Sequence, residues 1–146
     1  MAITGLTCEL NRNTGTYATP VWDAIGLTKD VTLNLEAASA DASSRGSGGW
    51  REYVQGLKDS SIEFEMVYDP ADADFTAIQG AFFNGTTLNV VALDGPSGTS
   101  GSQGLRMTCV VENFSRSEPL EEAVTVSVVL KPTPNTDSPP EWFTVP

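Results

Sequence analysis

Apolar and polar residues alternate one by one along much of the chain, which is the pattern of β-strands with one buried face. In residues 60–69, for example, Ile62 and Phe64 lie on one side of such a strand, opposite Glu63 and Glu65. Similar patterns predict strands at residues 27–36, 87–94, 105–114 and 122–131, and weaker ones at 18–22 and 52–57. The strand at 87–94 is apolar on both sides, so we expect both of its faces to be covered. The pattern predicts a mainly β fold.

One helix interrupts this series of strands. Asp69 is suited to be its N-cap, and Pro70 fits the first helical position, where a missing N–H costs nothing. The expected apolar face consists of Phe75, Ile78 and Phe82, and the Asn84-Gly85 pair is a typical helix end. Such a helix is expected to flank a β-sandwich.

Three irregular segments are predicted: an arm at residues 1–17, a Ser/Gly/Ala-rich loop at 37–51, and a Pro-rich tail at 132–146. A further Ser/Gly-rich loop is expected at residues 95–104. The prolines of the tail exclude a central strand there. The loop 37–51 carries Trp50, and the tail carries Trp142 and Phe143. Large aromatic side chains on irregular segments are expected to be buried on a neighbouring molecule.

Size and composition narrow the functional classes. The 146 residues suit one domain, 1–146, with a single core. The net charge of −11 repels nucleic-acid phosphates, which argues against sequence-specific nucleic-acid binding. Histidine is absent, which removes the usual nucleophile triads and the commonest metal ligand. Cys8 and Cys109 are expected to be reduced thiols.

Acidic clusters and glycine-rich stretches do not form a recognisable catalytic or ligand site. Glu63 and Glu65, like the adjacent Glu121 and Glu122, are more simply explained as solvent-exposed than as an acid–base pair. The aspartates near residue 70 lack the calcium-loop pattern, and residues 95–104 lack the signature of a phosphate-binding loop. We therefore expect no enzyme activity, no metal and no cofactor.

No stretch of the sequence is long and apolar enough to span a membrane, and the first residues do not resemble a secretory signal. We therefore expect synthesis in a cytoplasm and no contact with a membrane. Two of the scattered basic residues, Arg45 and Arg51, flank the tip of the loop 37–51. They either pair with carboxylates of a neighbouring copy or are solvated.

Three consecutive motifs carry a resemblance to a known family. They are KDVTLNL at residues 29–35, ADASSRGSGGWREY at 40–53, and GLKD at 56–59. In this order, and followed by a helix at 68–82 and a last strand at 122–131, they resemble the major tail tube proteins of long-tailed phages and of tail-like gene transfer particles. The resemblance covers about residues 22–131.

The resemblance implies a β-sandwich or barrel-like fold with one flanking helix and a long loop that reaches the next ring. Such proteins are structural: they assemble into stacked, usually hexameric rings within a virion, made in a bacterial host. The partners implied are further copies of the chain, a tape measure protein, a tail terminator, and DNA in transient passage.

The resemblance also suggests roles for particular residues. Arg45, Trp50 and Arg51 are expected to contact the neighbouring ring, and Trp142 and Phe143 to make further contacts. Carboxylates on polar strand faces are expected to line the lumen; the candidates are Glu36, Glu63, Glu65 and Glu112.

Two alternative functions remain open on the sequence. One is an immunoglobulin-like binding or display module on a virion, which also consists of short strands. The other is a different tail component with the same sandwich, such as a terminator or distal-tail protein. The long loop with its tryptophan favours the tube.

Overall fold

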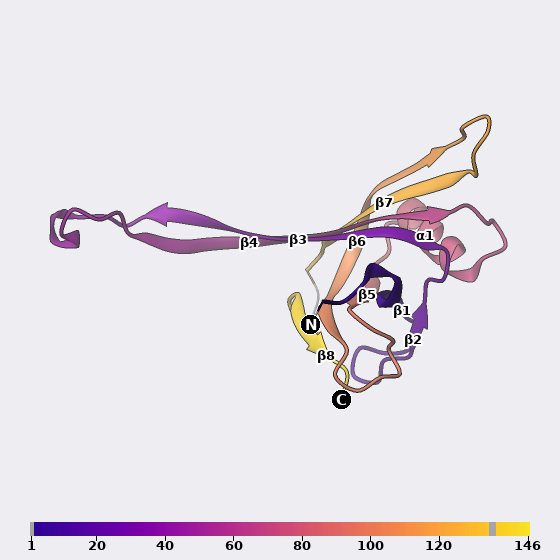
Figure 1. The fold of residues 1–146 in the computed structure, drawn as a ribbon, viewed down its shortest axis with the longest axis horizontal. Coiled ribbons are helices and arrows are strands. Elements are labelled where there is room, and N and C mark those ends of the chain that lie inside the picture. The colour runs from indigo at the N-terminus through magenta and orange to yellow at the C-terminus, as the bar shows by residue number, and fades with distance from the viewer. Residues whose placement is uncertain (1, 135–136) are drawn as a thin grey trace.

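The computed structural model of the chain describes residues 2–134 and 137–146 (Figure 1). Within these residues, eight antiparallel strands and one α-helix, α1 (Ala73–Asn84), form the fold. The strands are β1 (Glu9–Asn13), β2 (Trp22–Ala24), β3 (Thr28–Asp41), β4 (Tyr53–Val67), β5 (Leu88–Leu93), β6 (Gln103–Ser117), β7 (Thr125–Pro132) and β8 (Glu141–Thr144). The mainly β fold with one flanking helix, predicted from the alternation, is confirmed.

The sheet has the order β2-β1-β5-β6-β7-β4-β3, and β8 also pairs with β6. The long strand β6 belongs to both halves of this sheet: residues 104–109 pair with β5, and residues 109–117 pair with β7. One hydrophobic core contains Leu10 and Val90 from one half together with Phe64 and Val128 from the other. The two halves therefore face each other across the core as a sandwich.

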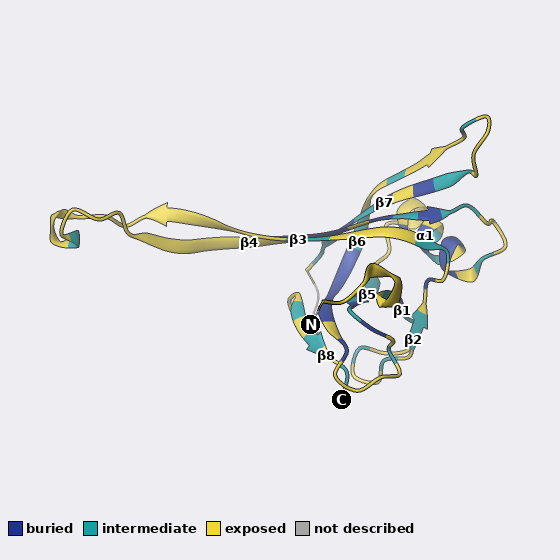
Figure 2. Ribbon diagram, in the orientation of Figure 1, coloured by how far each residue is buried: buried dark blue, intermediate teal, exposed yellow. Residues whose placement is uncertain are grey.

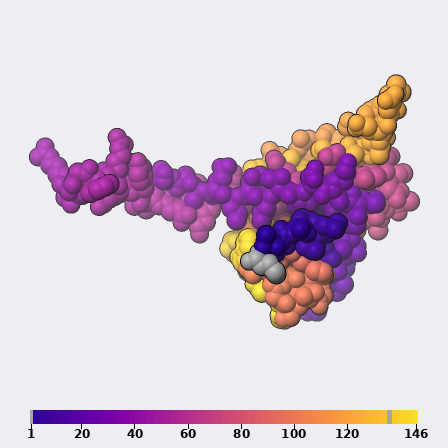
Figure 3. All heavy atoms as spheres, viewed as in Figure 1, coloured from indigo at the N-terminus to yellow at the C-terminus, as the bar shows by residue number. Residues whose placement is uncertain are grey.

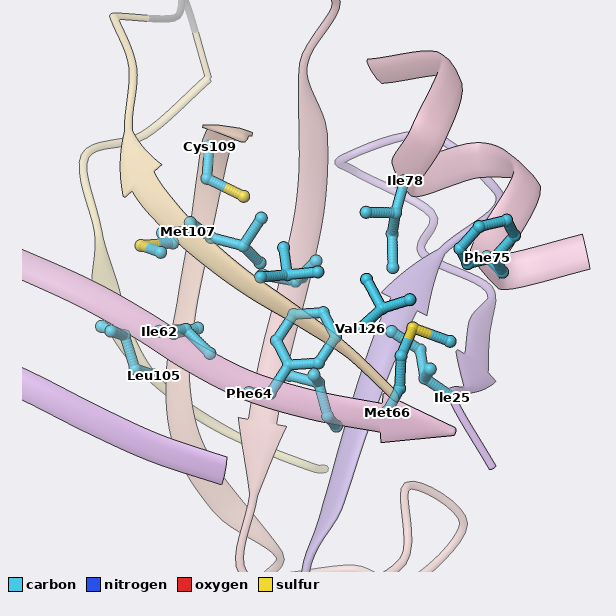
Figure 4. Packing of buried hydrophobic residues seen from close by; sticks show 14 residues of the cluster. Ile25, Ile62, Phe64, Met66, Phe75, Ile78, Leu105, Met107, Cys109 and Val126 are labelled. Carbon is cyan, nitrogen blue, oxygen red and sulfur yellow. The ribbon is translucent and has the colours of Figure 1, made fainter. Parts of the chain in front are cut away.

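The core forms from the apolar side of each alternating strand (Figure 4). In β4, Ile62, Phe64 and Met66 are buried, whereas Glu63 between them is exposed. In β5, both sides are covered, as the sequence predicted, since the adjacent Val90 and Val91 are both buried. Each large apolar side chain buried here stabilises the fold by roughly 1.5–3 kcal/mol.

The helix begins later than predicted. Its N-cap is Asp72, whose side chain accepts a hydrogen bond from the backbone N–H of Phe75. Asp69 instead accepts from the N–H of Ala71, which makes a turn before the helix. The predicted N-cap was wrong because both aspartates can bind a backbone N–H two or three residues further on. The C-terminal prediction is confirmed: Gly85 follows the helix in the left-handed conformation (φ 67°).

The loop predicted at residues 37–51 is shorter than expected. Residues 37–41 continue β3, and the weak candidate at 52–57 joins the strand at 60–69 to form the single strand β4. The connection between β3 and β4 is thus residues 42–52. The end of β3 was missed because it extends beyond the core, where neither face is buried and hydrophobic alternation is absent.

The N-terminal segment is more ordered than predicted. Residues 1–17, expected as an arm, contain β1, which pairs with β5 inside the sheet. The weak strand predicted at residues 18–22 lies instead at β2. The short polar sequence Glu9–Asn13 shows little alternation. The sequence therefore did not predict a strand there, between β2 and β5.

The last two irregular segments are corrected in a similar way. The tail 132–146 includes β8, an edge strand that pairs with residues 103–106 of β6 and begins after its last flanking proline, Pro140. The loop 95–104 is shorter by two residues because β6 starts at Gln103. Gly104 lies against the carbonyl oxygen of Ala92 on β5, where an added Cβ would overlap that oxygen.

Candidate assembly surfaces

A two-stranded arm projects from the sandwich (Figures 1 and 3). It consists of residues 36–59, where β3 and β4 pair only with each other, from Glu36 opposite Asp59 to Asp41 opposite Tyr53. All arm residues except Ser47 are exposed (Figure 2). At roughly 3.3 Å per residue, the paired stretch alone extends about 20 Å. A two-stranded hairpin that packs against nothing else is only marginally stable in water. An arm of this length is therefore expected to be stabilised by contact with another molecule.

The tip of the arm, residues 42–52, is held by its own hydrogen bonds. The N–H of Ser44 donates to Oγ of Ser47 at 3.0 Å, and the N–H of Glu52 donates to Oγ of Ser43 at 2.8 Å. Gly48 and Gly49 both have positive φ (66° and 86°), which a side chain would disfavour. The motif SSRGSGG therefore encodes a defined turn and not a flexible linker.

The three residues predicted to contact a neighbouring ring all lie at this tip. Trp50 is 79% exposed, and Arg45 is exposed as well. Arg51 lies 3.7 Å from Asp41, whose pKa is lowered by hydrogen bonds from the hydroxyl and backbone N–H of Ser43. The structure thus brings Arg45, Trp50 and Arg51 together at the end of the arm.

One half of the sandwich consists of β3, β4, β7 and residues 109–117 of β6. Its outer face, which points away from the core, is polar. Register places Thr32 opposite Glu63, Glu63 opposite Val129, and Ser127 opposite both Glu65 and Ser115. Partners in antiparallel strands share a face. We call this surface the polar face.

Two of the four predicted lumen residues, Glu63 and Glu65, lie on the polar face; Glu63 is exposed and Glu65 is half-buried. Glu36 is on the same side of β3 but lies opposite Asp59 at the base of the arm, where it is exposed. Glu112 is exposed at a β-bulge, where the register of β6 shifts between Val111 and Asn113.

Both borders of this four-stranded layer are unpaired within the described residues. β3 pairs only with β4. Residues 110–117 of β6 pair only with β7. Free strand edges expose backbone N–H and C=O groups to any chain that offers a matching edge.

The aromatic residues of the tail lie on the body of the same chain. Phe143 packs edge-to-face on Trp22, with ring centres 5.7 Å apart. Trp142 is 57% exposed, and its Nε1–H donates to Oε1 of Gln103 at 2.8 Å. The prediction that these residues lie on an irregular tail was wrong, because both are part of the strand β8. Trp142 is exposed and is therefore still able to contact another molecule.

Two further exposed apolar positions were not singled out from the sequence. Leu57, in the GLKD motif, is 88% exposed on the arm, and Leu120 is fully exposed in the turn between β6 and β7. A signal was present for Leu120, because it is an isolated leucine between Glu118 and Glu121 in a segment with no alternation.

The described residues hold no cluster of acidic, cysteine or histidine side chains that fits a metal ion. Cys109 is buried, which raises the pKa of its thiol to about 12, whereas Cys8 is exposed. Across residues 2–134 and 137–146, no helix has both the length and the apolar character that a membrane crossing requires.

Comparison with solved structures identifies several proteins with the same fold. The tail of an empty gene transfer agent (GTA) particle with C6 symmetry matches with a TM-score of 0.71 at 17% identity, covering 92% of this chain and 96% of that one. The SPP1 tail tube matches with a TM-score of 0.67 at 18% identity, covering 89% and 75%. The baseplate of the anti-feeding prophage matches with a TM-score of 0.62 at 12% identity, covering 99% and 97%.

No curated protein matches the sequence. The sequence model of a protein family, described as phage tail tube protein, matches residues 10–133, which are most of the chain and include the arm, the polar face and the helix. This chain belongs to the phage tail tube protein family and is a structural component of a tail tube.

Proposed function

We propose that copies of this chain close into rings, that the rings stack into a tube, and that the polar face lines a lumen through which DNA passes. The observation that carries this proposal is the four-stranded layer with two free edges and one polar face. A ring forms when β3 of each copy pairs with residues 110–117 of β6 in the next copy. The resulting barrel has no open edge, which removes the hazard of edge-to-edge aggregation.

Six copies are the proposed ring number. The tail of the GTA particle, which shares the fold, has C6 symmetry. Each copy then contributes four strands to a barrel wide enough for an aqueous channel, since barrels of 16–18 strands already leave one.

The polar face suits a conduit for DNA because it holds few groups that bind phosphate. Glu63 and Glu65 lie on it, its Lys131 is 3.4 Å from Asp59, and Lys29 lines a hollow there together with Glu65. At physiological salt, screening acts over about 8 Å, so carboxylates repel phosphates at the wall while ions fill the gap. No turnover is involved; the proposed activity is assembly and passive conduction.

The arm is proposed to join one ring to the next. Its exposed Trp50 and Leu57 would be buried by a second ring, whereas an immunoglobulin-like display module has no use for an arm of this length. The tape measure protein and the tail terminator remain proposed partners on the basis of the family resemblance.

The test is assembly of the purified chain. Sedimentation velocity and negative-stain electron microscopy over rising concentration are expected to yield rings and tubes. A variant whose residues 42–52 are replaced by an Asn-Gly turn keeps the core, because the arm makes no core contact; it should form rings that no longer stack. A chain that stays monomeric at millimolar concentration contradicts the proposal.

A further inference from the structure

An open groove runs between β3 and the β1-β5 side of the sandwich, with a volume of about 1010 Å³. Its lining is largely apolar and includes Leu6, Leu10, Val31, Leu33 and Trp142. Several of these side chains face water in the single chain: Leu6 is 94% exposed and Val31 is 40% exposed. The volume is at the upper end of small-molecule pockets, roughly 300–1,000 Å³, so it accommodates a tryptophan with its neighbours.

We infer that this groove receives the arm tip of a copy in the adjacent ring, with Trp50 in the apolar part and Arg45 beside the carboxylates at its margin. This inference rests on the proposed function and names the surface that the arm binds. The arm of the same chain projects away from the body (Figures 1 and 3), so the occupant comes from another copy.

Shape and rigidity favour Trp50 as the anchor. The tip hydrogen bonds between Ser44 and Ser47 and the two left-handed glycines fix the turn before docking. A preformed turn loses little conformational entropy when it binds. Most of the free energy gained by burying Trp50 therefore contributes to the affinity. Buried tryptophans are also the side chains that most often dominate interfaces.

Complementary charges also favour the contact between the arm tip and the groove. Asp30 and Asp94 line the groove along with Lys29, and neither aspartate forms an ion pair among the described residues. Arg45 likewise has no acidic partner in the part of the chain that the structure describes. In a chain of net charge −11, a locally basic tip is steered towards an acidic margin.

The turn between β6 and β7, which also exposes an apolar side chain, fits the groove less well than the arm tip does. Leu120 is fully exposed, but it is flanked by Glu118, Glu121 and Glu122. Insertion of this turn would bring carboxylates next to Asp30 and Asp94, and like charges in an interface oppose binding.

Cys8 provides a direct test, because its exposed thiol lies in the groove lining. Gly46→Cys and Arg51→Cys, made separately, place a second thiol on the arm tip; an added Cβ at Gly46 meets only ordinary contacts. A disulfide requires Cα atoms about 4.4–6.8 Å apart, so it reports close docking. Under mild oxidation, assembled tubes of at least one variant should give a ladder of cross-linked chains on a non-reducing gel.

Two controls identify the cross-link. Cys8→Ser in the same background should abolish the ladder, since Cys109 is buried and unreactive. Leu120→Cys, at the other protruding tip, should give no link to Cys8. Intact tubes without a link to Cys8 from either arm position, or with a link from Leu120→Cys instead, overturn the docking site and leave the proposed function standing. Absence of tubes in the unmodified chain contradicts the proposed function itself.

A charge exchange tests the ionic part. Arg45→Glu should raise the critical concentration for tube assembly by roughly three- to tenfold, the size expected for one rim ion pair turned repulsive. Adding Asp30→Arg to this variant should restore assembly, because the charges are complementary again. Equal assembly of Arg45→Glu and the unmodified chain, or failure of Asp30→Arg to restore it, contradicts the pairing.

Discussion

The guanidinium carbon of Arg106 lies 3.8 Å from the centre of the Tyr17 ring. Arg106 is buried on β6, and the rings of Trp22 and Phe143 flank it at 5.0 and 5.4 Å. Its Nη2 donates to the carbonyl oxygen of Tyr17 at 2.8 Å, and its Nε donates to Oδ1 of Asn89 at 3.2 Å. One buried cation thus joins the segment before β2, the strands β5 and β6, and the C-terminal strand β8.

Arg106→Lys should destabilise the chain. The ammonium of lysine keeps the charge but cannot stack as a plane on Tyr17 while donating to two separate acceptors. The combined loss of stacking and one charge-assisted hydrogen bond is about 2–3 kcal/mol of unfolding free energy. Urea unfolding at low protein concentration measures it. Arg45→Lys, at an exposed arginine of the arm tip with no ion pair among the described residues, should change stability by less than about 0.5 kcal/mol; equal losses in the two variants would refute a special role for the aromatic cluster.

Gly104→Ala should break the pairing of β5 with β6. A Cβ at this position overlaps the carbonyl oxygen of Ala92, a backbone atom that cannot rotate away. We expect a loss of at least about 3 kcal/mol, or failure to fold. Gly98→Ala is the matched control, because nothing lies within 4 Å of its added Cβ. Circular dichroism during thermal unfolding compares the two, and an unchanged melting temperature for Gly104→Ala would show that the strands can shift apart.

The sequence predicted the strands of the core because burial on one side leaves a period-two pattern. Ile62, Phe64 and Met66 carry that pattern, and they are buried as expected. On the arm, the weak strand predicted at 52–57 is part of β4, whereas residues 37–41 of β3 were predicted as a loop, since side chains such as Ser39 are exposed there and show no alternation. Strand order along the sheet follows from contacts between distant segments, which alternation does not encode.

The candidate site was predictable to the extent that it is local. Arg45, Trp50 and Arg51 are close in sequence and so share one turn. The groove was not predictable, because it forms from segments as distant as Leu6, Val31 and Trp142. The cluster around Arg106 was missed for the same reason: its aromatic partners lie near both ends of the chain.

Asp74 gives the fold a pH dependence. Burial, together with the neighbouring Asp23, raises its pKa to about 6, although Arg12 at 3.0 Å opposes the shift. Because the folded pKa lies above the usual value of 3.8, the proton is held more tightly in the folded chain. The contribution to stability is therefore complete below about pH 4 and is lost as pH rises through about 6.

Asp23→Asn should reduce this dependence. Removing the neighbouring carboxylate lets Arg12 act on Asp74 alone, so the pKa of Asp74 falls towards its usual value. We expect the decline in unfolding free energy between pH 4 and pH 7 to shrink by about 1 kcal/mol. Carboxyl chemical shifts followed by NMR report the pKa directly; a pKa of Asp74 that is unchanged in the variant would remove Asp23 as a cause.

The charge of the polar face supplies a functional prediction. Glu63→Lys combined with Glu65→Lys changes the net charge of each copy from −11 to −7, because each exchange adds two units. Both residues lie on β4, whose pairing they do not determine, so tubes should still form. If the polar face lines the lumen, the added lysines bind phosphates of the passing DNA and slow or arrest ejection, most strongly at low salt.

Particles carrying these tails, triggered to release DNA at several salt concentrations, measure the effect as an ejection rate. Glu63→Gln with Glu65→Gln removes the carboxylates without adding cations and should slow ejection much less. Normal ejection by the Glu63 and Glu65 lysine variant, at low salt and with intact tubes, would place the polar face outside the lumen, since DNA confined beside a ring of lysines cannot avoid them.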